Sequence, residues 1–61
     1  MTKHEKIFKG VRTIYHSIEY RKITINHSFD GFETETKIQY NKDDHVSIAV
    51  AGDVASVEWG I

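Results

Sequence analysis

The hydrophobic positions in the first third of the chain follow a helical period. Ile7, Val11, Ile14 and Ile18 recur at spacings of four, three and four residues. At about 100° per residue these side chains form one narrow apolar stripe, which is typical of an amphipathic helix. We therefore predict a helix over residues 3–19.

The start of this segment favours a helix more than its interior does. Residues 2–5 read Thr-Lys-His-Glu and fit the capping box, in which the threonine side chain accepts from a first-turn amide and the glutamate reaches back. Gly10, however, costs about 1 kcal/mol relative to alanine inside a helix, and several residues after it are β-branched. An alternative fold, a small all-β barrel, follows if residues 7–20 form strands.

After Tyr20 the hydrophobic period changes to two, which indicates half-buried strands. The dipeptide Asp30-Gly31 favours a two-residue type I′ turn between two such strands. The resulting register pairs Phe29 with Phe32, His27 with Thr34, Ile25 with Thr36, and Ile23 with Ile38. Both apolar sets then share one face, which a one-residue slip would not allow.

A second hairpin is predicted near the end of the chain. Residues 42–44, Lys-Asp-Asp, form a turn before it, and Gly52-Asp53 closes it. Its register sets Val50 against Ala55, Ile48 against Val57, and Val46 against Trp59. The predicted fold class is therefore α+β: an N-terminal amphipathic helix packed on a four-stranded antiparallel β-meander.

The predicted helix is narrower than the sheet it must cover. Four strands about 4.8 Å apart and about 25 Å long present a face of roughly 480 Å². A helix of about 17 residues is about 25 Å long and about 10 Å wide, so it covers about half of this face. Either strong coiling of the sheet or a second molecule must cover the rest, and we expect a homodimer.

The outward side of the last two strands predicts a partner-binding site. Its side chains are short and nearly all uncharged, so another backbone can approach closely, although such residues also occur on ordinary solvated surfaces. The predicted partner-binding residues are Ser47, Ala49, Ala51, Val54 and Ser56, with Trp59 on the edge.

Charge supplies two alternative functions. The net charge of the 61 residues is −1, but residues 1–22 hold six cations against two carboxylates, and residues 23–61 hold two against seven. A nucleic-acid-binding regulator would use the basic face of the helix and the residues after it, namely Lys9, Arg12, His16, Arg21 and Lys22. A mimic of DNA would instead present the acidic sheet residues Asp30, Glu33, Glu35 and Glu58.

The sequence carries no motif for catalysis or metal binding. The four histidines have no H-x-H or H-x-x-x-H spacing, and cysteine is absent. His27, on the inner side of its strand facing Thr34, is interpreted as structural, bonded to the threonine hydroxyl or to water. We therefore predict no catalytic residue, no metal, no cofactor and no enzymatic activity.

No apolar run approaches the roughly 20 residues of a membrane span, and none resembles a signal peptide. With no cysteine, these features predict one small cytoplasmic domain over residues 1–61 that does not bind membranes. Its expected function is that of a non-catalytic protein-interaction module. We predict a homodimeric small regulator or inhibitor that acts by binding another protein.

Overall fold

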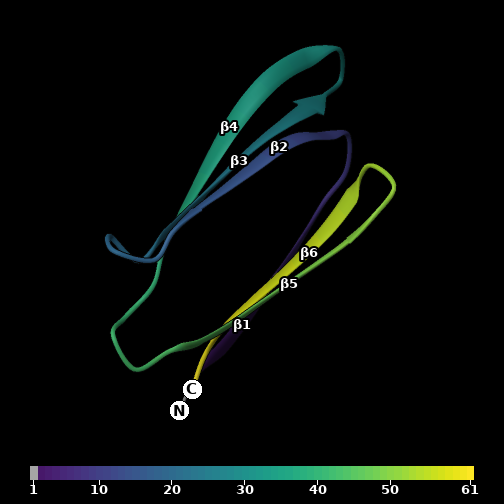
Figure 1. Cartoon of the computed structure of the whole chain (residues 1–61). Coiled ribbons are helices and arrows are strands. Elements are labelled where there is room, and N and C mark those ends of the chain that lie inside the picture. Colours follow the sequence, from purple (N-terminus) through teal and green to yellow (C-terminus); the bar gives the residue numbers. More distant parts are fainter. Residues whose placement is uncertain (1) are drawn as a thin grey trace.

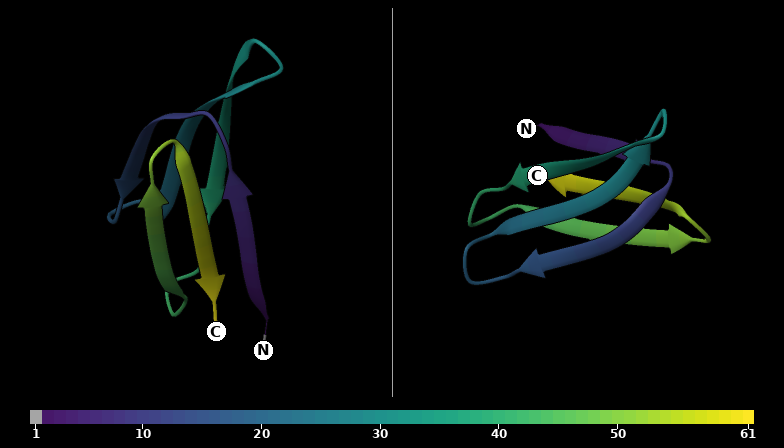
Figure 2. Two further views of the ribbon diagram at one scale, coloured as in Figure 1. Left: turned by 90° about the vertical axis from the view of Figure 1, so that its right-hand side faces the viewer. Right: turned by 90° about the horizontal axis from the view of Figure 1, so that it is seen from above.

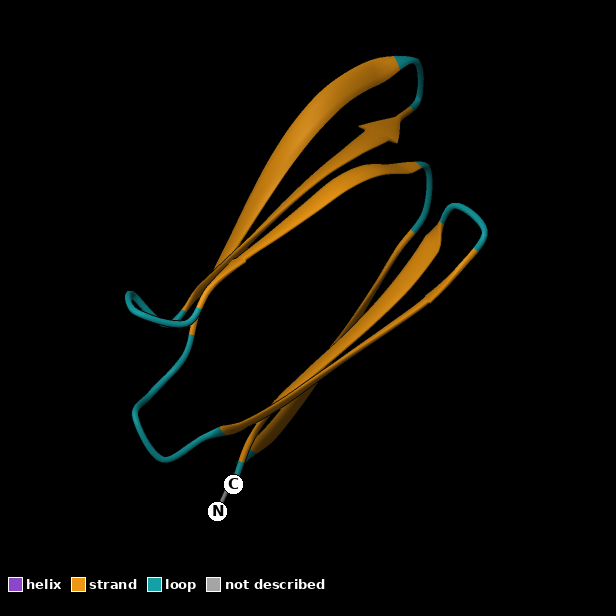
Figure 3. Cartoon of the chain, viewed as in Figure 1, coloured by secondary structure: helices purple, strands orange, loops and turns teal. Residues whose placement is uncertain are grey.

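The computed structural model describes residues 2–61, and all of their regular structure is β. These residues form two three-stranded sheets, ordered β1-β6-β5 and β2-β3-β4, which face each other as two layers (Figure 1; Figure 3). Every pairing is antiparallel. The strands are β1 (Lys3–Phe8), β2 (Val11–Ser17), β3 (Lys22–Phe29), β4 (Phe32–Gln39), β5 (His45–Ala51) and β6 (Val54–Gly60).

The helix predicted over residues 3–19 is wrong, because this segment forms β1 and β2. The chain bends between the two strands at Gly10, where φ is +68°. The register of β2 also shifts just after Val11. Each interruption moves the inward side by one position, so the inward side chains of Phe8, Val11 and Ile14 are spaced by three. Of the predicted stripe, Val11 and Ile14 thus pack against the core, whereas Ile7 and Ile18 are exposed, so the helical period did not mark one buried face.

The four-stranded meander is also wrong. β4 pairs with β3 and β5 pairs with β6, but residues 40–44 carry the chain from one sheet to the other (Figure 1). β6 then lies between β5 and β1, which joins the two ends of the chain in one sheet. The alternative with strands within residues 7–20 is closer to the structure, which is all-β but divided into two sheets.

Both predicted hairpin registers are confirmed. Phe29 pairs with Phe32, and Val50 pairs with Ala55. The other five predicted pairs also form, as far as Ile23 with Ile38 in one hairpin and Val46 with Trp59 in the other. Asp30 and Gly31 have φ of +52° and +83°, as a type I′ turn requires. These local features were correct although the assembly of the hairpins was not.

The apolar core lies between the two sheets. Ile23 and Ile25 of one sheet and Ala55 and Val57 of the other are fully buried, and Phe8, Ile38 and Tyr40 are nearly so. At one corner the amide of Val11 donates to the carbonyl of Asp53 at 2.8 Å, which ties β2 to the β5–β6 turn. Each sheet covers the apolar face of the other, so the narrow-helix reason for expecting a homodimer no longer applies.

Candidate interaction surface

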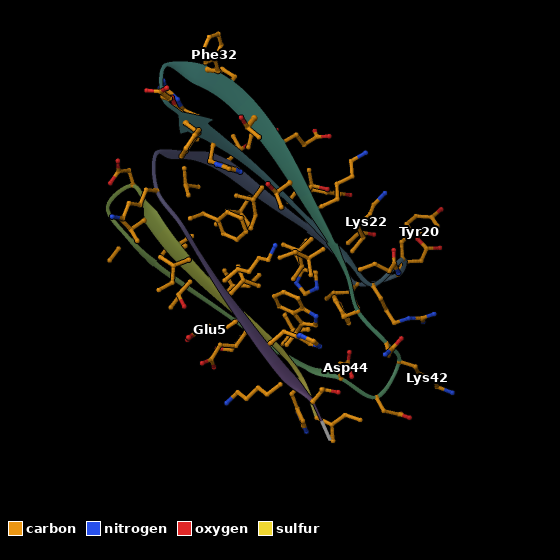
Figure 4. The ribbon with its side chains drawn as sticks, turned by 180° about the vertical axis from the view of Figure 1, so that it is seen from behind. Glu5, Tyr20, Lys22, Phe32, Lys42 and Asp44 are labelled. Carbon is orange, nitrogen blue, oxygen red and sulfur yellow. The ribbon has the colours of Figure 1, made fainter. Side chains whose placement is uncertain are left out.

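The β3–β4 hairpin ends in two exposed phenylalanines. Phe29 and Phe32 lie directly opposite each other on the two strands, and 72% and 73% of their surfaces are exposed. They continue the inward-facing series of β3 and β4, but the opposite sheet does not cover them. Figure 4 shows Phe32 at the far end of the hairpin, with its ring pointing away from the rest of the chain. We call this pair the phenylalanine tip.

The bend between β1 and β2 explains why the phenylalanine tip is uncovered. The amide of Ser28 donates to the carbonyl of Gly10 at 2.8 Å, so the crossing segment lies against β3 one residue before Phe29. The hairpin continues past this crossing. Its last inward side chains therefore extend beyond the core.

Other exposed apolar side chains lie at the opposite end of the same sheet. Ile18 and Tyr20 belong to the β2–β3 turn, and Tyr15 lies on the outer side of β2. Figure 4 shows Tyr20 and Phe32 at opposite ends of the β2-β3-β4 sheet. These residues therefore form a surface separate from the phenylalanine tip.

The structure brings together five of the six predicted partner-binding residues. Ser47, Ala49, Ala51, Val54 and Ser56 share the outer face of the β1-β6-β5 sheet, because Ala49 pairs with Ser56 and Ala51 pairs with Val54. The pairing of β1 with β6 places the exposed Ile7 beside Ser56.

Trp59 is separated from the other five residues. It points inward, packs against the core and stacks on His4 with ring centroids 5.2 Å apart. It also lines a cavity of about 430 Å³ at the end of the β5–β6 hairpin remote from its turn, near the ion pair between Lys3 and Glu58. Its own register, opposite Val46, already implied this inward position.

The predicted basic face does not exist, because the helix that would carry it does not exist. Lys9 lies in the β1–β2 bend, and the seven residues of β2 separate it from Arg21 and Lys22. Nε2 of His16 lies 2.6 Å from the hydroxyl of the buried Tyr40. Arg12 lies 3.3 Å from a carboxylate oxygen of Glu33. The five predicted residues therefore do not form one surface.

The four acidic residues do not form one purely acidic surface either. Glu33 lies beside Arg12, and Glu35 lies 3.5 Å from the ammonium group of Lys37. Glu58 lies in the other sheet, 3.8 Å from Lys3. Three of the four carboxylates proposed to imitate DNA phosphates thus each have a neighbouring cation.

His27 makes a hydrogen-bond contact different from the predicted one. It pairs in register with Thr34, as expected, but its Nε2 lies 2.8 Å from the hydroxyl of Thr36. Its ring also contacts the ring of Phe8, with centroids 5.2 Å apart. These contacts are those of a residue that joins the sheets.

Within residues 2–61, no three histidine or carboxylate side chains are close enough to hold a metal ion. The same residues include no helix with the length and hydropathy needed to cross a membrane.

Comparison with family profiles, curated proteins and solved structures gives no significant match.

The phenylalanine tip was missed in the sequence because Phe29 and Phe32 were interpreted only as a cross-strand pair on the inner face of the predicted sheet. A usable signal was present, since Phe29 and Phe32 directly flank the two-residue turn Asp30-Gly31. Residues that flank such a turn lie at the extreme end of a sheet. Covering them therefore requires an opposing layer that reaches equally far.

Proposed function

We propose that this chain is a non-catalytic protein-interaction module, a small regulator or inhibitor that binds another protein through the phenylalanine tip. The observation that carries the proposal is the exposure of two adjacent aromatic side chains at the end of a hairpin. Large aromatic residues are enriched among those that dominate binding energy at protein interfaces.

The phenylalanine tip has enough apolar surface to anchor a partner. Full burial of one phenylalanine side chain contributes about 1.5–3 kcal/mol, so the pair would contribute about 3–6 kcal/mol. At about 1.4 kcal/mol per tenfold change, this corresponds to roughly a hundredfold or more in affinity. The tight turn and the cross-strand pairing already hold both rings in place, so less conformational entropy is lost on binding.

Photo-crosslinking in the cells that make the protein can identify the partner. A photoreactive phenylalanine analogue is placed at position 32 and, as the control, at position 15. Tyr15 is also exposed, but it lies on the outer side of the same sheet. We expect a protein that crosslinks from position 32 and does not crosslink from position 15.

The captured protein is then purified and titrated against matched double variants. The Phe29→Ser and Phe32→Ser double variant should bind about a hundredfold more weakly, from the loss of about 3 kcal/mol or more of apolar burial. The Tyr15→Ser and Ile18→Ser control should bind as the unmodified chain does. Equal affinity of the phenylalanine double variant and the unmodified chain would rule out the tip as the anchor.

The nucleic-acid alternatives have lost the geometry on which they depended, since the basic residues are dispersed and most of the acidic ones have neighbouring cations. The non-catalytic character of the module stays a prediction. A cytoplasmic location is part of the proposal, and the absence of cysteine supports it, because such a chain needs no oxidising compartment.

A further inference from the structure

The two sheets of the described chain leave four edge strands, and one of them lacks the usual protection. Edge strands expose unpaired backbone groups, which proteins normally shield with charged side chains or bulges. β1 contains Lys3, Glu5 and Lys6, β4 contains Glu33, Glu35 and Lys37, and β2 contains Arg12 and a register shift. β5 reads HVSIAVA, with no aspartate, glutamate, lysine or arginine, and its register with β6 is uninterrupted.

The free backbone groups of β5 belong to three residues. Because a two-residue turn joins β5 to β6, Ala51 and Val54 form a hydrogen-bonded pair. Hydrogen-bonded and non-bonded pairs alternate along an antiparallel ladder. Val46, Ile48 and Val50 therefore direct their N–H and C=O groups to the open edge. Among the backbone hydrogen bonds of residues 2–61 outside the strand ladders, none involves β5, and Figure 2 shows β5 at the margin of its sheet.

The side chains of the same three residues are incompletely covered. Their cross-strand partners are the inward residues Trp59, Val57 and Ala55. Val46 and Ile48 are half-buried against the core, and 58% of the surface of Val50 is exposed. The edge of β5 thus combines free backbone donors and acceptors with apolar side chains that another strand would cover.

We infer that a second copy of this chain pairs with β5, antiparallel, across a two-fold axis at Ile48. In this register Ile48 faces Ile48 of the second copy, and Val46 faces Val50 of the second copy. Val46, Ile48 and Val50, whose backbone groups are directed to the open edge, all form hydrogen-bonded pairs with the second copy. This gives about six backbone hydrogen bonds. The β1-β6-β5 sheets of the two copies become one six-stranded sheet, and its inner side is apolar throughout.

The sequence of β5 favours a second copy over an unrelated strand. Residues 46–50 read Val-Ser-Ile-Ala-Val, so the alternation of β-branched and small residues is the same in both directions. A two-fold axis requires such a self-complementary surface. In the dimer Ser47 faces Ala49 on the outer side, and no like charges oppose each other, as they would along β1 or β4.

The expected dimer is weak. Seven residues at about 3.3 Å each give a strand of about 23 Å, and two sheet layers are about 20 Å thick, so each copy buries about 460 Å². The total of about 900 Å² is below the 1,200–2,000 Å² or so of stable interfaces, so the dimer should dissociate readily on dilution. This interface does not include the phenylalanine tip, so the inference does not rest on the proposed partner.

Sedimentation equilibrium of the purified chain, from about 1 to 500 µM, tests the inference over the concentrations at which a weak dimer forms. The mean mass should rise above 7.1 kDa with concentration. Val50→Lys places a charge on the edge and should weaken the dimer at least tenfold. Ile7→Lys is the matched control, because Ile7 is 63% exposed on the edge strand β1, and its dimer should be unchanged.

Backbone methylation provides a second test, which does not depend on whether Val50→Lys disturbs folding. A chain synthesised with an N-methyl group on Ile48 loses one edge amide and no side-chain atom, and its dimer should be weakened. N-methylation of Glu35 is the control, because the same alternation directs this amide to the open edge of β4. A monomer at all concentrations would overturn the inference. So would a dimer that is insensitive to both β5 changes, or one that the controls weaken equally.

Discussion

The substitution Gly10→Ala tests the corner at which the chain passes from one sheet to the other. Gly10 has φ of +68°, and an added Cβ atom would lie 2.7 Å from the carbonyl oxygen of Ser28. The carbonyl of Gly10 also accepts a hydrogen bond from the amide of Ser28 at 2.8 Å. No side-chain rotation can relieve this contact, because the backbone of residue 10 fixes the Cβ atom and the oxygen belongs to the backbone of Ser28.

The expected loss has two parts. A left-handed conformation costs an alanine about 1–2 kcal/mol. Relief of the contact with Ser28 costs about 1–3 kcal/mol more, as overpacking does, or weakens the hydrogen bond between the two segments. The sum is about 2–5 kcal/mol, whereas a chain of 61 residues has a free energy of unfolding of only about 3–9 kcal/mol. One methyl group should therefore remove a large part of the stability.

Gly31→Ala is the matched control. Gly31 also has a positive φ, of +83°, but outside its two chain neighbours no atom lies within 4 Å of the added Cβ position. This variant should lose only the conformational part, about 1–2 kcal/mol. The difference between the two variants therefore measures the close approach at Gly10.

Urea unfolding measures both losses through the fluorescence of Trp59, the only tryptophan, which packs against the core. With a slope of about 1 kcal/mol/M for so small a protein, a loss of 3 kcal/mol lowers the midpoint by about 3 M. If the two variants unfold within about 0.5 kcal/mol of each other, the packing of β1–β2 against β3 is wrong, since differences of this size arise from ordinary surface changes.

Further substitutions test the core between the sheets and the contact between His16 and Tyr40. Ile25→Ala should reduce the free energy of unfolding by about 2–5 kcal/mol, since Ile25 is fully buried. Ile18→Ala, at a position that is 77% exposed, should change it by less than about 0.5 kcal/mol. Equal effects of the two variants in urea titrations would contradict the burial of Ile25 in the core. Tyr40→Phe removes the hydroxyl that lies 2.6 Å from Nε2 of His16 and should cost about 0.5–1.5 kcal/mol. An unchanged imidazole spectrum of His16 by NMR would show that this contact does not form.

The two hairpins could be predicted from sequence because each is encoded within about 18 residues. The turn dipeptides and the alternation of side chains determine register together, and both registers are confirmed. The same alternation correctly placed Ser47, Ala49, Ala51, Val54 and Ser56 on one face.

Residues 3–19 could not be assigned from their periodicity alone. A positive φ at Gly10 and a register shift after Val11 each change the inward side by one position. The resulting spacing of three between Val11 and Ile14 is also a helical spacing, but the other two residues of the predicted stripe, Ile7 and Ile18, are exposed. The β-branched residues after Gly10 indicated strands, but local propensity is weaker than the pattern of hydrophobic residues.

The sequence by itself determined the strand pairs whose partners are neighbours along the chain, because their geometry depends on a turn and a period of two. Only the tertiary structure decided that β1 pairs with β6, because this pairing joins segments about 50 residues apart through backbone hydrogen bonds, which do not depend on the side chains. It also decided that the two sheets oppose each other. That long-range arrangement also decided which apolar residues are covered. It buries Ile25 and leaves Phe29 exposed, although both occupy the same face of one strand.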